Sequence, residues 1–256
     1  MLVKLKYFVF LLLVAVTLPL VLQSCSSSSK TDIKTDDPEQ AFKTAKRNFD
    51  KRDYLQAIED FSFIKIKFSG TKIMDRSQFY LAMCYYNRKE YILSAYEFEY
   101  LIKNYPTSEF QVQARYYLAM SYYQLSPSSD LDQIYTRYAI TEFQNFLELY
   151  PKDVNAADSR NRIRELRDKL AYKEYRNAEL YMAMGNYKAA IIYYEKTLQD
   201  YFDSSWADYA LLGKIKALIA REKNDLALKE IERFEKKFGD SKLLQQVLGI
   251  KNNLKP

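Results

Sequence analysis

The chain has 256 residues, a formal net charge of +6, no histidine and only five glycines. Without histidine, the serine–histidine and cysteine–histidine nucleophile pairs and most zinc sites are excluded, and five scattered glycines cannot build a phosphate-binding loop. The composition therefore predicts a protein that is not an enzyme, with no metal and no cofactor.

The first 25 residues have the pattern of a lipoprotein signal. Lys4 and Lys6 precede an apolar run from Tyr7 to Leu22, and a small residue, Ser24, stands directly before Cys25. The run has the length and flanks of a cleaved signal peptide rather than of a spanning helix. We expect residues 1–24 to be removed and Cys25 to carry a covalent lipid such as palmitate. The alternative is an uncleaved signal anchor in which Cys25 has no role.

A serine-rich stretch follows the cysteine, and residues 25–37 are predicted to form a flexible tether because they contain almost nothing that could be buried. Once Cys25 is acylated, Cys84 is the only thiol and no internal disulfide can form. Cys84 lies on an apolar helical face, which predicts a buried core residue rather than a reactive thiol. After removal of the signal the formal charge is +4, too small to indicate nucleic acid as a partner.

The remainder of the chain repeats itself. Five helical patterns end in a large aromatic residue, preceded seven residues earlier by a large apolar residue and eleven residues earlier by a small one. Since seven and eleven residues are two and three helical turns, the three positions share one face of a helix. The closing aromatics are Phe68, Tyr105, Tyr150, Tyr201 and Phe238; the large residues are Phe61, Phe98, Phe143, Tyr194 and Ile231; the small ones are Ala57, Ser94, Ala139, Ala190 and Ala227.

The second and third units show the fuller pattern of Leu81-Ala82, Tyr85 and Pro106, and of Leu118-Ala119, Tyr122 and Pro151. This pattern resembles the tetratricopeptide repeat, in which each unit is a pair of antiparallel helices. It predicts an all-α solenoid of about five helix pairs. The expected units of this domain, 38–256, are 38–71, 75–108, 109–152, 153–203 and 204–240, followed by a C-terminal helix.

Two insertions interrupt the period. In unit three, residues 126–130 are rich in serine and proline and predict an inserted loop. In unit four, residues 155–184 lack proline and glycine, which predicts one long first helix of about 45 Å. Its arginines alternate with acidic residues and therefore indicate a solvated face rather than a nucleic-acid site.

Large side chains also recur on the first helices away from the packing positions. Two aromatic rows with a third row between them predict a surface for an extended apolar or aromatic-ended peptide. An equally good interpretation is that the rows pack between neighbouring helices. The aromatic rows are Phe42, Phe79, Tyr116 and Phe49, Tyr86, Tyr123, and the row between them is Lys46, Met83, Met120.

The segment 166–171, followed by Glu174-Tyr175, Ala178-Glu179, Tyr181 and 185–187, closely resembles the fourth repeat of the BamD family, the lipoprotein subunit of the outer-membrane β-barrel assembly machine. The lipobox, the number of repeats and the length are similar too, particularly to the Bacteroidetes branch. The resemblance implies a non-catalytic adaptor whose first repeats receive the targeting strand of unfolded barrel proteins. Its later repeats would hold the periplasmic domains of BamA, beside other lipoproteins of the machine.

Proteobacterial members of this family tend to carry a basic side chain on the second helix of unit four. The shared glycine and aromatic residue, Gly185 and Tyr187, align that position with Tyr193 of this chain. Arg160, Arg164 and Arg176 are therefore candidate substitutes for that basic side chain, and together with Tyr193 they form the predicted surface for BamA. The alternative function is another periplasm-facing repeat lipoprotein, pilotin-like or Tol-associated. Serines rather than aspartate follow Cys25, which predicts the outer membrane, with the protein facing the periplasm.

Overall fold

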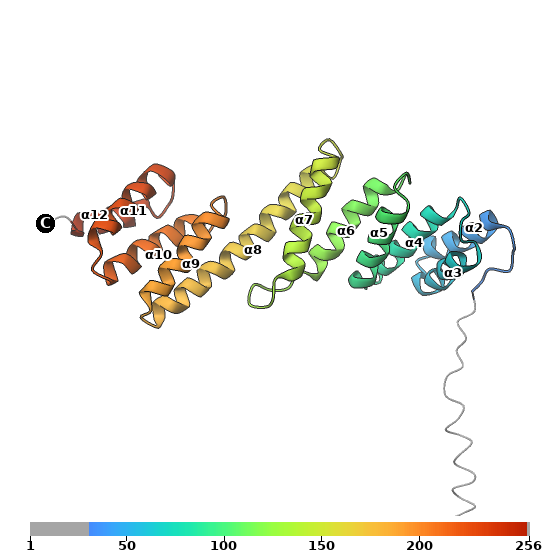
Figure 1. Ribbon diagram of the computed structural model, residues 1–256, viewed down its shortest axis with the longest axis horizontal. Helices are drawn as coiled ribbons and strands as arrows, with labels where there is room; N and C mark the ends of the chain where they lie inside the picture. The colour runs from blue at the N-terminus through green and yellow to red at the C-terminus, as the bar shows by residue number, and fades with distance from the viewer. Residues whose placement is uncertain (1–30, 255–256) are drawn as a thin grey trace, which may run out of the picture.

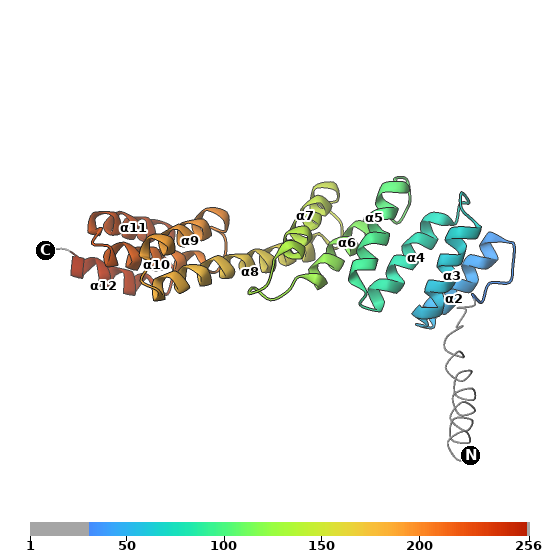
Figure 2. The ribbon, with the colours of Figure 1, turned by 60° about the horizontal axis from the view of Figure 1, so that its bottom comes forward.

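The structure is a computed structural model that describes residues 31–254, so the predicted signal peptide and Cys25 lie outside the described residues. The described chain contains helices and no strand. Successive helices pack against one another in an elongated stack (Figures 1 and 2). The helices are α2 (Pro38–Asp50), α3 (Tyr54–Lys67), α4 (Met74–Asn87), α5 (Tyr91–Asn104), α6 (Gln111–Leu125), α7 (Ile134–Leu149), α8 (Ala156–Ala183), α9 (Tyr187–Asp200), α10 (Ala207–Ala220), α11 (Asn224–Lys237) and α12 (Leu244–Leu254).

The helices form pairs in chain order. The first helices are α2, α4, α6, α8 and α10, the second helices are α3, α5, α7, α9 and α11, and α12 follows as the C-terminal helix. One pair corresponds to each expected unit, and only α4 begins outside its unit, one residue before position 75. The predicted all-α tetratricopeptide-repeat solenoid is confirmed.

The positions read from the sequence form the core of the stack. All five small residues at the eleven-back position are fully buried, and all five large residues at the seven-back position are at most 1% exposed. Tyr80 stacks on Phe61 with ring centroids 6.0 Å apart, and Tyr117 stacks on Phe98 at 5.9 Å, so one inter-unit contact recurs 37 residues later. This repeated aromatic contact fixes how one helix pair sits on the next.

Four of the five connections from first to second helix share one turn geometry. Arg52, Lys89, Gly185 and Glu222 have positive φ angles of 63°, 64°, 71° and 59°. In each case the next residue donates its N–H to a carbonyl five residues back, as in Asp53 to Asn48. This is the Schellman ending of a helix. Three of the four positions are not glycine and bear a left-handed conformation that costs roughly 1 kcal/mol.

Both predicted insertions are confirmed. The α6–α7 connection spans residues 126–133 in place of a tight turn. Helix α8 runs without a break for 28 residues, about 42 Å at a rise of about 1.5 Å per residue. Because α8 extends beyond the helices before it, units four and five lie farther along the stack than a regular repeat would place them (Figure 1).

The helical domain holds the residues that precede α2, which we expected to be a flexible tether. Ile33 is only 6% exposed, and the fully buried carboxylate of Asp60 accepts hydrogen bonds from the Thr31 hydroxyl at 2.7 Å and the Asp32 amide at 2.8 Å. Asn48 Nδ2 donates to the same carboxylate at 2.8 Å. The prediction of a flexible tether over 25–37 is therefore wrong from Thr31 onward. A buried carboxylate needs donors, and the leading segment supplies two of them.

Cys84 is fully buried, as predicted, and burial raises the pKa of its thiol, with Arg88 opposing the shift. Within residues 31–254, no helix is both long enough and apolar enough to cross a bilayer.

Candidate functional site

The first predicted aromatic row lies along the first helices of units one to three and is engaged in packing. Phe42 contacts Phe61 and Tyr80 with ring centroids 6.0 and 5.9 Å apart. Phe79 stacks on Phe110 at 4.6 Å and is only 8% exposed. The row therefore belongs in part to the joints between units.

The second row remains more accessible. Phe49, Tyr86 and Tyr123 are all half-buried. Tyr86 meets Tyr117 at 5.2 Å, and Phe49 meets Tyr80 at 5.1 Å, each edge to face. Each ring of this row thus keeps part of its surface open to a partner.

The structure separates the two interpretations of the rows. Phe79 and Met120 are 8% and 9% exposed, so the prediction that they line an open groove is wrong, because neighbouring units cover them. The other seven residues are half-buried, and we call them the first-helix surface. They are Phe42, Lys46, Phe49, Met83, Tyr86, Tyr116 and Tyr123.

Cations sit on the rings of this surface. The Arg76 guanidinium lies 4.3 Å from the Phe42 centroid, and Lys46 Nζ lies 5.6 Å from the Phe49 centroid. Each cation is also paired with a carboxylate, Arg76 with Glu39 and Lys46 with Asp50. Cation–aromatic contacts stabilise these side chains in place and make the surface both aromatic and charged.

Two tyrosines of the first-helix surface in unit three form hydrogen bonds with α8. Tyr116 donates its hydroxyl proton to Asp158 at 2.9 Å, and Tyr123 donates to Glu165 at 2.7 Å. Burial, followed by these hydrogen bonds to carboxylates, raises the pKa of both phenols. Arg162 lies 4.6 Å from the Tyr123 centroid. The two phenols therefore connect the first-helix surface with unit four.

The four residues predicted to contact a partner are not brought together. Arg160 and Arg164 are exposed and lie one turn apart on α8, whereas Arg176 is twelve residues beyond Arg164, more than 100° around the helix. Arg176 contacts Tyr172, and Tyr193 stacks on Tyr181 at 5.2 Å. Any partner that meets all four must cover much of unit four.

An aromatic cluster in units four and five was not predicted from the sequence. Trp206 packs on Tyr172 at 4.6 Å, on Tyr175 at 5.2 Å and on Tyr209 at 5.5 Å. Burial, with Glu179 nearby, raises the pKa of Tyr175 to about 12. A shallow depression of about 700 Å³ adjoins the cluster and is lined in part by Trp206, Tyr209 and Lys242. The one signal in the sequence was that this is the single tryptophan.

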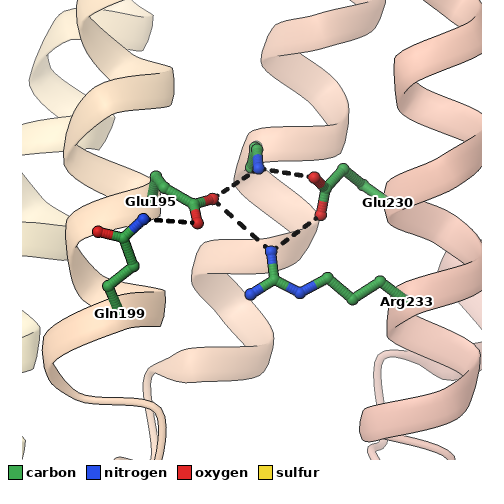
Figure 3. A network of polar contacts seen from close by, with 5 residues as sticks. Glu195, Gln199, Glu230 and Arg233 are labelled. Carbon is green, nitrogen blue, oxygen red and sulfur yellow. Dashed lines mark hydrogen bonds and ion pairs between the residues drawn. The ribbon is translucent and has the colours of Figure 1, made fainter.

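A charge network joins the last two units (Figure 3). Lys214 of α10 contacts Glu195 of α9 at 2.6 Å and Glu230 of α11 at 2.7 Å, and Arg233 contacts Glu230 at 3.2 Å. The Lys214 side chain is only 12% exposed. Burial alone would raise the pKa of Glu195, but the hydrogen bond and charge of Lys214 outweigh it and lower that pKa. The network therefore connects α9, α10 and α11.

These features define a class of protein. The fold is a stack of helix pairs with an extended aromatic and charged face, suited to holding another polypeptide. The chain belongs to the YfiO family, the BamD family of outer membrane lipoproteins, whose model matches residues 34–247. The family predicted from the segment 166–187 is therefore confirmed, and the protein is an outer-membrane lipoprotein scaffold.

Solved repeat proteins resemble the chain at low identity. The TPR2AB-domain:pHSP90 complex of yeast Sti1 is 12% identical with a TM-score of 0.45, over 80% of this chain and 78% of that one. A TPR repeats protein from Bacteroides fragilis is 14% identical with a TM-score of 0.45, over 86% and 100%. A tetratricopeptide repeat protein from Parabacteroides merdae is 14% identical with a TM-score of 0.40, over 78% and 79%.

Proposed function

We propose that this protein is the adaptor of the β-barrel assembly machinery that receives targeting strands of unfolded outer-membrane proteins and holds the periplasmic domains of BamA. The observation that carries the proposal is the half-buried first-helix surface of units one to three in a member of the BamD family. Aromatic rings with open area can stack on the aromatic end of an extended peptide. The role is one of binding, and no catalytic step is expected.

Units four and five supply the second half of the proposal. Arg160 and Arg164 are exposed, and Arg164 has no ion pair or hydrogen bond from its side chain within the described residues. The cluster of Trp206 with Tyr172 and Tyr175 adds aromatic side chains farther along α8. Arginine and aromatic side chains are enriched at protein interfaces, which supports units four and five as the surface for BamA.

The anchor completes the proposal. A lipid on Cys25 would hold the solenoid at the outer membrane, facing the periplasm, where unfolded barrel proteins arrive. Other lipoproteins of the assembly machine would be anchored in the same membrane beside it.

Peptide binding tests the proposal. The lipoprotein with Phe49→Ala and Tyr86→Ala should bind an aromatic-ended barrel-protein peptide at least about tenfold more weakly, because each ring is a candidate interface anchor. Phe63→Ala is the matched control, since Phe63 is a half-buried ring on a second helix. Equal peptide affinity in both variants, with native helical circular dichroism, would remove units one to three as the binding surface.

A further inference from the structure

Exposed apolar side chains gather along one edge of the solenoid. We call this the turn edge: the connections from first to second helix together with the helix halves next to them. Among the described residues, eleven of the fifteen large apolar side chains that are exposed lie there. They are Leu55, Ile92, Leu93, Tyr96, Leu131, Ile134, Tyr138, Leu180, Met184, Ile192 and Leu226.

The opposite edge, formed by the connections from second to first helix, carries only the remaining four: Ile66, Leu149, Val154 and Phe202. Figure 1 shows the two sets of connections on opposite sides of the stack, with the α6–α7 and α8–α9 connections on the same side. The exposed apolar side chains of the turn edge thus come from all five units rather than from one.

The leading segment runs toward this edge. From the start of α2 at Pro38, the chain passes back along α2 and α3 until Asp32 accepts a hydrogen bond from Asn48, two residues before the end of α2. Thr31 is fastened there to Asp60. The described chain therefore begins on the half of unit one that faces the α2–α3 turn.

Little chain separates this point from the expected lipid. Cys25 stands six residues before Thr31, and six residues fully extended span about 20 Å. A lipid on Cys25 would therefore hold the turn edge of unit one within about that distance of the bilayer.

Basic residues accompany the apolar ones in the units nearest the anchor. Lys51, Arg52 and Lys89 are exposed at the first two turns, and their side chains have no acidic partner in residues 31–254. Arg52 and Lys89 are the residues with positive φ. Long cationic side chains beside apolar ones suit the boundary between anionic headgroups and acyl chains.

We propose that the turn edge lies on the membrane surface, its apolar side chains at the headgroup boundary and the basic residues of units one and two against anionic lipid. The proposal rests on the lipid anchor of the proposed function. It adds membrane contact along the whole turn edge to the attachment at Cys25. It orients the first-helix surface relative to the bilayer, because the helices stand with their turn ends on the membrane.

The test uses the acylated full chain in vesicles of phosphatidylethanolamine and phosphatidylglycerol. A fluorescent label is placed at Leu93→Cys or Tyr138→Cys, and at Val154→Cys or Phe202→Cys as matched exposed positions on the opposite edge. Buried Cys84 does not compete for the label. A headgroup nitroxide lipid should quench most of the emission at positions 93 and 138 and little of that at 154 and 202. Equal quenching on both edges would overturn the proposal.

A charge variant gives a second measurement. Lys51→Glu, Arg52→Glu and Lys89→Glu together should reduce quenching at position 93 in anionic vesicles. The control variant combines Lys103→Glu, Lys152→Glu and Lys236→Glu, which change the charge by the same amount at exposed lysines away from the turn edge. Quenching at position 93 should be unchanged in this control. If only the addition of BamA domains shielded positions 93 and 138, the edge would be a protein interface and the proposal would be wrong.

Mass spectrometry of the same preparation reports the lipid on Cys25 separately. An acylated chain without quenching at positions 93 and 138 would overturn the proposal that the turn edge lies on the membrane, and the proposed adaptor function would be unaffected. A chain without lipid would overturn the anchor and the turn edge together.

Discussion

The ring of Tyr194 occupies the space that a side chain on Gly213 would need. A Cβ atom at Gly213 would lie 2.3 Å from Tyr194 Cζ, well inside van der Waals contact. Tyr194 is fully buried at the position that Phe61, Phe98 and Phe143 hold in the earlier units, and its hydroxyl donates to Glu179. The larger ring of unit four thus requires a glycine in the next first helix.

Gly213→Ala should therefore destabilise the protein although alanine favours helices. Overpacking a filled core costs about 1–3 kcal/mol, more than the roughly 1 kcal/mol that alanine gains over glycine within a helix. We expect a lower midpoint of urea unfolding. Gly249→Ala in α12 is the control, because its Cβ would meet nothing within 4 Å, and it should be neutral or stabilising. A stabilised Gly213→Ala variant would contradict the packing described.

Replacing Asp60 should release the leading segment. Asp60→Asn exchanges one acceptor oxygen for a donor facing the donors of Thr31, Asp32 and Asn48, which leaves buried polar groups unpaired at a cost of about 1–3 kcal/mol. We expect the amide of Ile33 to exchange with solvent faster, as read by hydrogen exchange with mass spectrometry. Asp36→Asn removes an ion pair of an exposed carboxylate and should change neither exchange nor stability. Unchanged exchange at Ile33 in Asp60→Asn would show that Asp60 does not hold the segment.

The charge network should contribute more than an exposed ion pair does. Lys214→Met leaves two glutamates without their shared cation and should cost about 2 kcal/mol of unfolding free energy. Lys46→Met breaks a pair in which Asp50 is 58% exposed and should cost less than about 1 kcal/mol. Chemical denaturation of both variants measures the difference. Equal losses would mean that the burial of Lys214 adds nothing.

The same network predicts a pH dependence. Lys214 lowers the pKa of Glu195 below its ordinary value of 4.5. A carboxyl whose pKa is lower in the folded state stabilises the fold above its unfolded pKa, and this contribution is lost as the pH falls through the folded value. Acidification below about pH 4.5 should therefore narrow the stability gap between the native protein and Lys214→Met. A gap that stays constant down to pH 3 would contradict the lowered pKa.

The repeat could be predicted because its signal is periodic. Phe61 and Phe98 are 37 residues apart, and each is buried and stacks on a tyrosine of the next unit. A repeat in the sequence therefore corresponds to a repeated contact in the structure. Periodicity could not separate Phe79 from Phe42, because burial between units depends on side chains such as Phe110 that lie outside the repeat pattern.

Two other features of the structure could not be predicted from the sequence. The leading segment is polar apart from Ile33, so composition predicted a tether, whereas a single buried carboxylate on α3 holds it. The cluster of Tyr172, Tyr175 and Trp206 spans the long α8 and the start of α10. The insertion in unit four shifts its register, and the 37-residue comparison therefore missed it.

We propose that this lipoprotein is an adaptor of the barrel assembly machinery. Affinity purification of the full acylated chain from detergent-solubilised envelopes, followed by mass spectrometry, tests it most directly. We expect BamA to be recovered with the native protein and to be lost from the variant that carries Arg160→Glu and Arg164→Glu, although that variant stays in the membrane fraction. Recovery of a secretin or a Tol component without BamA would contradict it.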